Sequence, residues 1–225
     1  SIWVPPIKNI SVSIFIDPYE TQVINQEITV SIFQNDVCVD EFSKSLQIKN
    51  NLYLSSEIFS KFNSGVVCVI KFKKQSSISA YIHVSYIVNG IQGDVVHSHQ
   101  SSATEILNNN IKKIDKGKSC LKFMHFPFSS DNSLFSWIAV WNEKTIHGNN
   151  EFSLRILDMK NREFICYFNF SKEIIKAISL NELVKNNDSS HYIVQLNSSC
   201  ANYSASVLTY NSKTHQTACD HTSGG

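Results

Sequence analysis

Alternation of apolar and polar residues constrains this sequence most, because it recurs along the whole chain. It is clear at Ile28, Val30 and Ile32, and again between Trp137 and Trp141. Residues two apart on a strand point to the same face, so this spacing predicts strands with one buried and one wetter face. Such strands are typical of antiparallel sheets and not of a doubly wound parallel sheet.

Segments rich in Val, Ile, Phe, Tyr, Ser and Thr are separated by clusters of Asn, Gly, Ser and Asp, which are turn-forming residues. In chain order they are "SVSIFID", "EITVSIFQND", "VCVIKFKK", "AYIHVSYIVNG", "SLFSWIAVWN", "FSLRILDM", "REFICYFNF", "HYIVQLN" and "YSASVLTYN". The number of such segments predicts an all-β protein.

Two segments, "LYLSSEIFSKF" and "SKEIIKAISLNELVKN", space their apolar residues closer to a helical period. In the second, Ile174, Ile178 and Leu183 would share one side, with Ser171 as the N-cap. An extended stretch followed by a single helical turn fits both segments equally well. We expect one or two short helices on a β scaffold.

The same order of elements occurs in both halves of the chain. Each half has a short Glu-containing element ("SSEIF", then "LNELV"), a hydrophobic strand ("CVIKF", then "YIVQL"), a long Tyr-rich strand and a His-Ser ending. This order predicts an internal duplication. We expect two tandem antiparallel β-sandwich modules, residues 1–102 and 120–225, joined by a linker over residues 103–119.

A gapless superposition of residues 80–100 on residues 202–222 is the most direct form of this duplication. The identities that it produces are Tyr81 with Tyr203, Asn89 with Asn211, and His99 with His221. It predicts that the last strand of each module carries its histidine at an equivalent position.

Charge and composition exclude several classes of protein. The 20 basic and 19 acidic residues leave a net charge of +1, so we expect no nucleic-acid partner. An apolar share of 42% and a charged share of 17% indicate a globular chain with a substantial core. No apolar stretch is long enough to predict a membrane span.

Six cysteines invite a disulfide framework, but their surroundings are more informative than their number. Cys68 is in phase with Val66, and Cys166 lies among the phenylalanines of "FICYFNF". Both are predicted to act as small hydrophobic residues on the core side of a strand. Cys200 and Cys219 flank the last hairpin and could form a disulfide or remain thiols.

The stretch "GDVVHSHQSS" contains His97 and His99, which would share one face of a strand. Two imidazoles at this spacing can chelate one divalent metal ion, and His125 could supply a third nitrogen. Cys219-x-His221 repeats the pattern in a weaker form near the end of the chain. The alternative is that His99 and His221 occupy equivalent places where an imidazole packs on a sheet edge, and we favour this alternative.

The run "GDVVHSHQSSATE" from Gly93 to Glu105 resembles the start of the metal motif in cupin-type β-barrels. The resemblance implies a metal-dependent β-barrel enzyme with His97, His99 and His125 as ligands. The chain departs from the cupin pattern because Glu105 lies too far from the second histidine. It also has no Pro-x-Gly turn before His125.

Trp137 and Trp141 are the strongest aromatic candidates for binding, since they share one face of a strand. An exposed pair would form a platform for stacking on sugar rings, whereas a buried pair would belong to the core between sheets. Ile138 and Val140 make the opposite face equally apolar. We therefore expect core packing first, with an interface as the alternative.

Common catalytic motifs are absent from the sequence. There is no Gly-x-Ser-x-Gly motif and no glycine-rich phosphate loop, and only seven glycines occur. We therefore predict a non-catalytic binding or structural protein without a cofactor. Its partner would be a protein, another copy of itself or a carbohydrate surface, and the candidate contacts are Trp137, Trp141, His99 and His221. The alternative is the cupin-like enzyme with one divalent metal ion.

Overall fold

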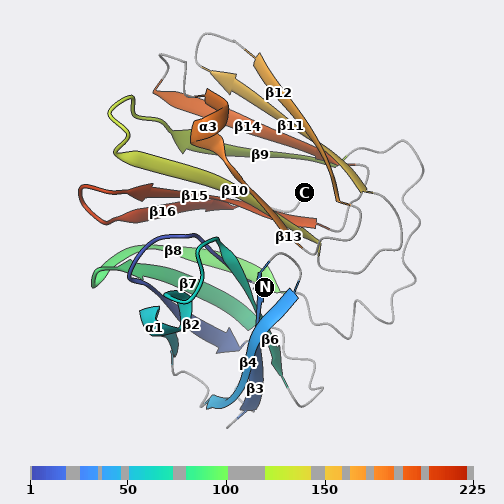
Figure 1. Ribbon diagram of the computed structural model, residues 1–225. Helices are drawn as coiled ribbons and strands as arrows, with labels where there is room; N and C mark the ends of the chain where they lie inside the picture. The colour runs from blue at the N-terminus through green and yellow to red at the C-terminus, as the bar shows by residue number, and fades with distance from the viewer. Residues whose placement is uncertain are drawn as a thin grey trace. The chain divides into compact units, whose positions relative to one another are not determined.

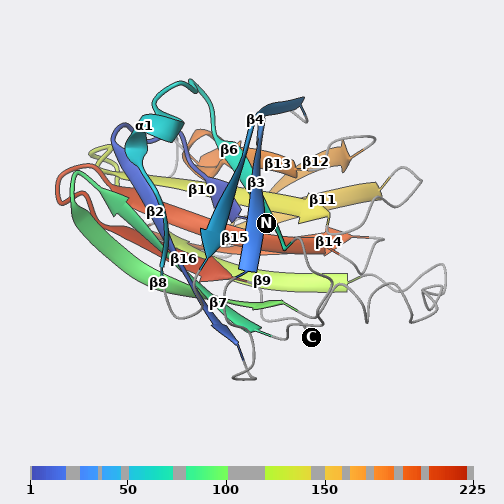
Figure 2. The ribbon, with the colours of Figure 1, turned by 90° about the horizontal axis from the view of Figure 1, so that it is seen from below.

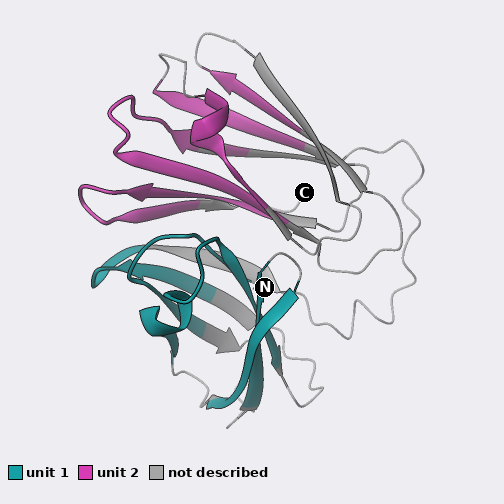
Figure 3. Ribbon diagram, viewed as in Figure 1, with its two compact units in different colours: residues 1–113 teal, residues 114–225 magenta. Residues whose placement is uncertain are grey.

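The computed structural model describes residues 2–18, 26–34, 37–46, 51–72, 80–100, 120–142, 150–158, 163–170, 175–184, 190–198 and 203–221. Near the ends of several strands it describes the backbone alone. The chain divides into two compact units, Ser1–Lys113 and Ile114–Gly225 (Figure 3). The division falls within the predicted linker, 103–119, which lies outside the described residues.

Unit 1 contains two antiparallel sheets, with strand orders β1-β6-β3-β4 and β5-β2-β7-β8 (Figure 1). Its elements are β1 (Ile2–Val4), β2 (Ile10–Pro18), β3 (Gln26–Gln34), β4 (Val37–Leu46), β5 (Leu52–Leu54), α1 (Ser56–Phe59), β6 (Val66–Phe72), β7 (Ala80–Val88) and β8 (Ile91–Gln100). The single-turn helix α1 follows β5 and lies beside β2 (Figure 2).

Unit 2 also contains two antiparallel sheets, with orders β12-β11-β14-β9 and β13-β10-β15-β16. Its elements are β9 (Cys120–Pro127), β10 (Leu134–Asn142), β11 (Asn150–Asp158), β12 (Glu163–Phe170), β13 (Ile175–Ser179), α3 (Leu180–Val184), β14 (His191–Ser198), β15 (Tyr203–Asn211) and β16 (Thr217–His221). The predicted all-β class with antiparallel sheets and short helices is confirmed. The strand order is the same in both units, with each strand of unit 1 corresponding to the strand eight places later; an origin by duplication stays a prediction.

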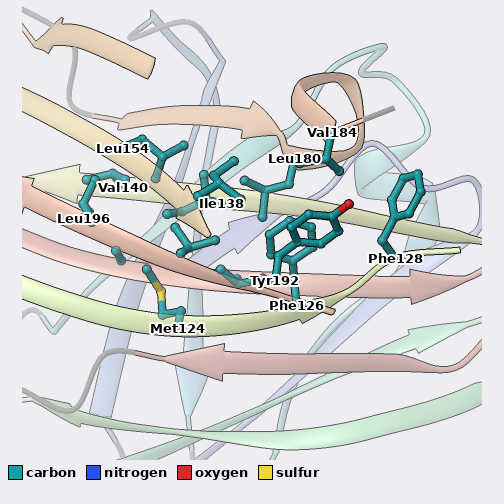
Figure 4. Close-up of a cluster of buried hydrophobic side chains, with 14 residues drawn as sticks. Met124, Phe126, Phe128, Ile138, Val140, Leu154, Leu180, Val184, Tyr192 and Leu196 are labelled. Atoms are coloured by element: carbon teal, nitrogen blue, oxygen red, sulfur yellow. The ribbon is translucent and has the colours of Figure 1, made fainter. Parts of the chain in front are cut away.

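The alternation in the sequence corresponds to burial between the two sheets of each unit. In unit 2, Ile138 and Val140 of β10 pack against Leu154 and Leu196 of the facing sheet (Figure 4). In unit 1, Ile14 of β2 is completely buried. Burying each such side chain contributes about 1.5–3 kcal/mol, so the alternating positions supply most of the driving force for sandwich formation.

One hydroxyl in each unit connects its two sheets. The Tyr86 Oη donates to the Trp3 backbone oxygen at 2.7 Å in unit 1. In unit 2 the Ser136 Oγ donates to the Pro127 backbone oxygen at 3.4 Å, and it also lies 2.8 Å from the Thr209 Oγ1. Both acceptors belong to the first strand of their unit, so the two sandwiches share this feature as well as their strand order.

The expected helix over "SKEIIKAISLNELVKN" is shorter than its apolar spacing suggests. Residues 175–179 form strand β13, where Ile178 pairs with Ile138, and only Leu180–Val184 are helical. The helical assignment was therefore wrong for Ile178, and the alternative of an extended stretch followed by one turn is correct for residues 175–184. Pairing with β10 overrides the local spacing because it satisfies the backbone of a β-branched segment.

The gapless superposition of the two last hairpins is not consistent with their pairing. His99 pairs with Tyr81, but His221 pairs with Ser206 rather than Tyr203, so the three matches cannot hold together. The turns explain the difference. A two-residue turn joins β7 to β8, with positive φ at Asn89 (50°) and Gly90 (82°). Residues 212–216 join β15 to β16.

Cys68 is fully buried in β6, opposite Ile32 of β3. Its predicted role as a small core residue is confirmed, and burial raises the pKa of its thiol to about 12. The Cys166 side chain and the whole of Cys200 lie outside what the structure describes. Among the described residues, no helix is long and apolar enough to cross a membrane.

Candidate functional site

Trp137 lies on the outer face of the sheet β13-β10-β15-β16. The neighbouring Ser136 and Ile138 face the core between the sheets, so residues 135 and 137 must face the other way. Trp137 is half-buried and is not a member of the core cluster. It therefore does not pack in the core between the sheets, contrary to the expectation from the sequence. Trp141 shares this face by its position in the strand, but its side chain is not described.

A row of four rings crosses this outer face, and we call it the aromatic strip. The ring centroids of Trp137 and Phe135 are 6.2 Å apart, those of Phe135 and Tyr210 6.4 Å, and those of Tyr210 and His215 6.3 Å. The interplanar angles are 18°, 27° and 19°, so successive rings are nearly parallel. Centroid separations of about 4.5–7 Å between nearly parallel rings are typical of offset stacking.

Strand pairing positions the centre of the strip. Phe135 and Tyr210 are direct partners across β10 and β15, and partners across an antiparallel pair share a face. Phe135 is 37% exposed, whereas Tyr210 is half-buried. Asn181 of α3 holds the backbone on both sides of Phe135: its Oδ1 accepts from Ser136 N at 2.6 Å and its Nδ2 donates to Leu134 O at 2.7 Å.

The loop after β15 holds His215 against Tyr210. His215 N donates to Asn211 O at 2.8 Å, and the Asn211 Oδ1 accepts from the backbone of Lys213 at 2.9 Å. The Tyr210 hydroxyl lies 2.9 Å from the His215 Nδ1. Burial raises the pKa of Tyr210, so its phenol is protonated at neutral pH and donates to that nitrogen when the nitrogen carries no proton.

A charged pair lies on the loops at the same end of the sheet. The Lys213 Nζ is 2.6 Å from the Asp131 Oδ2, and Asp131 also accepts from the Ser129 Oγ at 2.5 Å and Ser133 N at 2.9 Å. These donors, first of all Lys213, hold the pKa of Asp131 well below its usual range. A second link, from Ser212 N to Ser133 O at 2.8 Å, fixes the two loops to each other.

The candidate metal ligands are divided between the two units. His97 and His99 lie on β8, an edge strand of unit 1, whereas His125 lies on β9 of unit 2, opposite Ile193. Within the side chains that the structure describes, no group of three His, Cys, Asp or Glu residues could hold a metal ion, and these three side chains are not among them.

Within unit 1, His97 pairs with His83 of β7, a residue that was not selected from the sequence. The two-residue turn at Asn89 and Gly90 does not give this pairing by itself. It sets Val88 opposite Ile91, and a β-bulge between Ser85 and Ile87 then shifts the register by one residue, which places His97 opposite His83. His221 lies on β16, the edge strand of unit 2 that corresponds to β8, and its partner is Ser206.

Comparison with protein families, curated proteins and solved structures returned no match.

Proposed function

We propose that this protein is a non-catalytic binding protein that holds a carbohydrate on the aromatic strip of unit 2. The observation that carries the proposal is the continuous row Trp137, Phe135, Tyr210 and His215 on the outer face of one sheet. A row of nearly parallel, laterally displaced rings offers a flat apolar surface. The carbon-bound hydrogens of a sugar ring pack well against such a surface.

Polar groups beside the strip supply what a sugar needs besides stacking. Lys213, Thr214 and Gln216 are exposed on the loop that carries His215. Their side chains offer both donors and acceptors, and sugar hydroxyls require both. An apolar surface with a small number of nearby polar groups is the usual composition of a site for a small ligand.

The size of the strip supports a small ligand over a protein. A stable protein interface buries about 800 Å² on each partner and is built around deeply buried aromatic anchors. In the strip only Phe135 is exposed, while its three neighbours are half-buried. Binding to a protein or to a second copy of the chain is therefore the alternative that the experiment must separate.

Affinity electrophoresis in gels containing soluble glucans, xylans, mannans or galactans tests the proposal, followed by calorimetric titration with oligosaccharides of the retarding polymer. We expect one class of polymer to retard the protein. Phe135→Ala should weaken binding by at least about tenfold, or 1.4 kcal/mol, because it removes the exposed ring. Ile193→Ala is the matched control, since Ile193 is 38% exposed on the other sheet of the same unit.

Asn181→Ala separates contact from positioning. It keeps all four rings but removes the two hydrogen bonds that hold the backbone beside Phe135, so a smaller loss of affinity is expected. The proposal fails if no polymer retards the folded protein, or if Ile193→Ala weakens binding as much as Phe135→Ala. A concentration-dependent dimer that Phe135→Ala dissociates would instead identify the strip as a self-association surface.

A further inference from the structure

Three histidines share the outer face of the unit 1 sheet β5-β2-β7-β8. The inner face of β7 is identified by Tyr86, which donates across to the other sheet, and by the buried Val84. His83 is one residue from Val84 and therefore faces outward. His97 is the direct partner of His83, so its register position belongs to the same face, as does that of His99 two residues later.

Register brings these positions within the reach of one metal ion. Direct partners on an antiparallel pair have Cβ atoms about 4.5–5.5 Å apart. Residues two apart on one strand are separated by roughly 6.5–7 Å. The positions of His83, His97 and His99 thus form a compact triangle on two neighbouring strands. Three imidazoles and one water are a common ligand set for zinc, with Zn–N distances of about 2.0–2.1 Å.

We propose that His83, His97 and His99 form a site for a divalent transition-metal ion, with zinc as its occupant. The site is independent of the proposed carbohydrate function, which depends on residues of unit 2. It also differs from the ligand set that the cupin resemblance implied, because His83 replaces His125.

The surroundings of His83 support a site at this position. Phe15 of β2 is its partner on the other side, and the two ring centroids lie 5.8 Å apart at an interplanar angle of 47°. An aromatic neighbour limits the orientations that an imidazole can adopt, which lowers the entropic cost of ligation. Among the described strands β8 pairs with β7 and lies at the sheet edge, so a metal ion bridging the two strands would also stabilise that edge.

The corresponding hairpin of unit 2 does not repeat the triangle. On β16, Cys219 pairs with Leu208 and His221 pairs with Ser206, and β15 contains no histidine. The comparison predicts a single metal equivalent for the whole chain. The number of metal ions bound per chain therefore tests whether only the unit 1 hairpin forms a site.

Titration of the chelator-treated full chain with Co²⁺, followed by competition with Zn²⁺, tests the site. We expect one equivalent of Co²⁺ with the intense visible absorption of tetrahedral coordination and without a thiolate charge-transfer band. Loss of a residue that hydrogen-bonds a metal ligand typically lowers metal affinity by roughly 10–100-fold. His83→Ala, His97→Ala and His99→Ala each remove a ligand itself, so each should lower Co²⁺ affinity by more than that. His125→Ala and His191→Ala, with both residues in unit 2, are matched controls that should leave affinity unchanged.

Far-UV circular dichroism of each variant checks that it is folded, and His83→Gln repeats the test for any alanine variant that is not. Absence of Co²⁺ binding by the folded wild-type chain would overturn the proposal. Loss of binding in His125→Ala but not in His83→Ala would overturn it in favour of the cupin-type ligand set. A thiolate band would assign the metal to cysteine.

Discussion

Unit 1 and unit 2 join their strands in the same order but present different residues on corresponding outer faces. The strand order β5-β2-β7-β8 of unit 1 corresponds to β13-β10-β15-β16 of unit 2. On the first of these sheets the outer face carries His83 and the register positions of His97 and His99. On the second it carries the aromatic strip through Phe135 and Tyr210.

The difference shows at which positions of the two-sheet unit the side chain has to be apolar. Most residues that face the core are apolar in both units, as Ile14 and Ile138 are, and the buried Ser136 satisfies its hydroxyl by hydrogen bonding. On the outer face of the unit 2 sheet, Ala139 and Leu208 are buried as well, whereas Phe135 is 37% exposed, so that requirement is relaxed at part of the face. Specific chemistry can therefore differ between two units of the same strand order, and in each unit we propose it for the outer face.

The largest effect is expected from truncating the core of one unit at a time. Ile14→Ala in β2 and Ile138→Ala in β10 should each reduce the free energy of unfolding by about 2–5 kcal/mol. Hydrogen exchange followed by mass spectrometry should show faster exchange in the truncated unit alone, since each unit is compact by itself. Equal acceleration in both units would contradict separate cores and show one cooperative structure.

A medium effect is expected from the hydroxyls that connect the sheets. Tyr86→Phe removes the 2.7 Å hydrogen bond to Trp3 O and should cost about 1–2 kcal/mol, measured by urea unfolding. Ser136→Ala should cost less, because its bond to Pro127 O is 3.4 Å long. Tyr53→Phe is the control, since Tyr53 is 49% exposed. A larger loss in Ser136→Ala than in Tyr86→Phe would reverse this comparison of the units.

The smallest effect is expected at the Asp131–Lys213 pair, which is exposed on the loops of unit 2. The folded state lowers the pKa of Asp131, so the stability that this carboxylate contributes is present above about pH 4 and is lost as the pH falls toward the folded-state pKa. Lys213→Met should raise that pKa toward its usual value, as measured by NMR titration of the carboxyl carbon. Lys61→Met, which removes the Lys61–Asp40 pair of unit 1, should leave it unchanged.

Central strands were predictable, whereas among the edge strands β12 was predicted from "REFICYFNF" and β4 was not. The alternation of Ile28, Val30 and Ile32 identified β3 because all three are buried. β4 was not predicted because it lies at a sheet edge, and its apolar residues Val37 and Val39 are 62% and 42% exposed. A strand that contributes little to the core has no reason to show the alternation.

The candidate site was predictable only in part. Trp137 was selected from its own strand, but its outward face was not predicted, because Ile138 and Val140 make the other face of that strand equally apolar and core packing was expected first. Tyr210 and His215 were not selected, although both contact the strip, because they are about 75 residues further along the chain. His83 was missed as the partner of His97 because a β-bulge between Ser85 and Ile87 shifts the register by one residue from the one that the turn at Asn89 and Gly90 sets.

The sequence by itself determined the all-β class and the core residues of the central strands. It did so because burial selects a side chain at every second position, and that selection is local. The tertiary structure alone decided the strand orders, the register that sets His83 against His97, and the meeting of Phe135 with Tyr210. Pairing joins residues that are distant in sequence, so its outcome depends on turn geometry and on the competition among all strands.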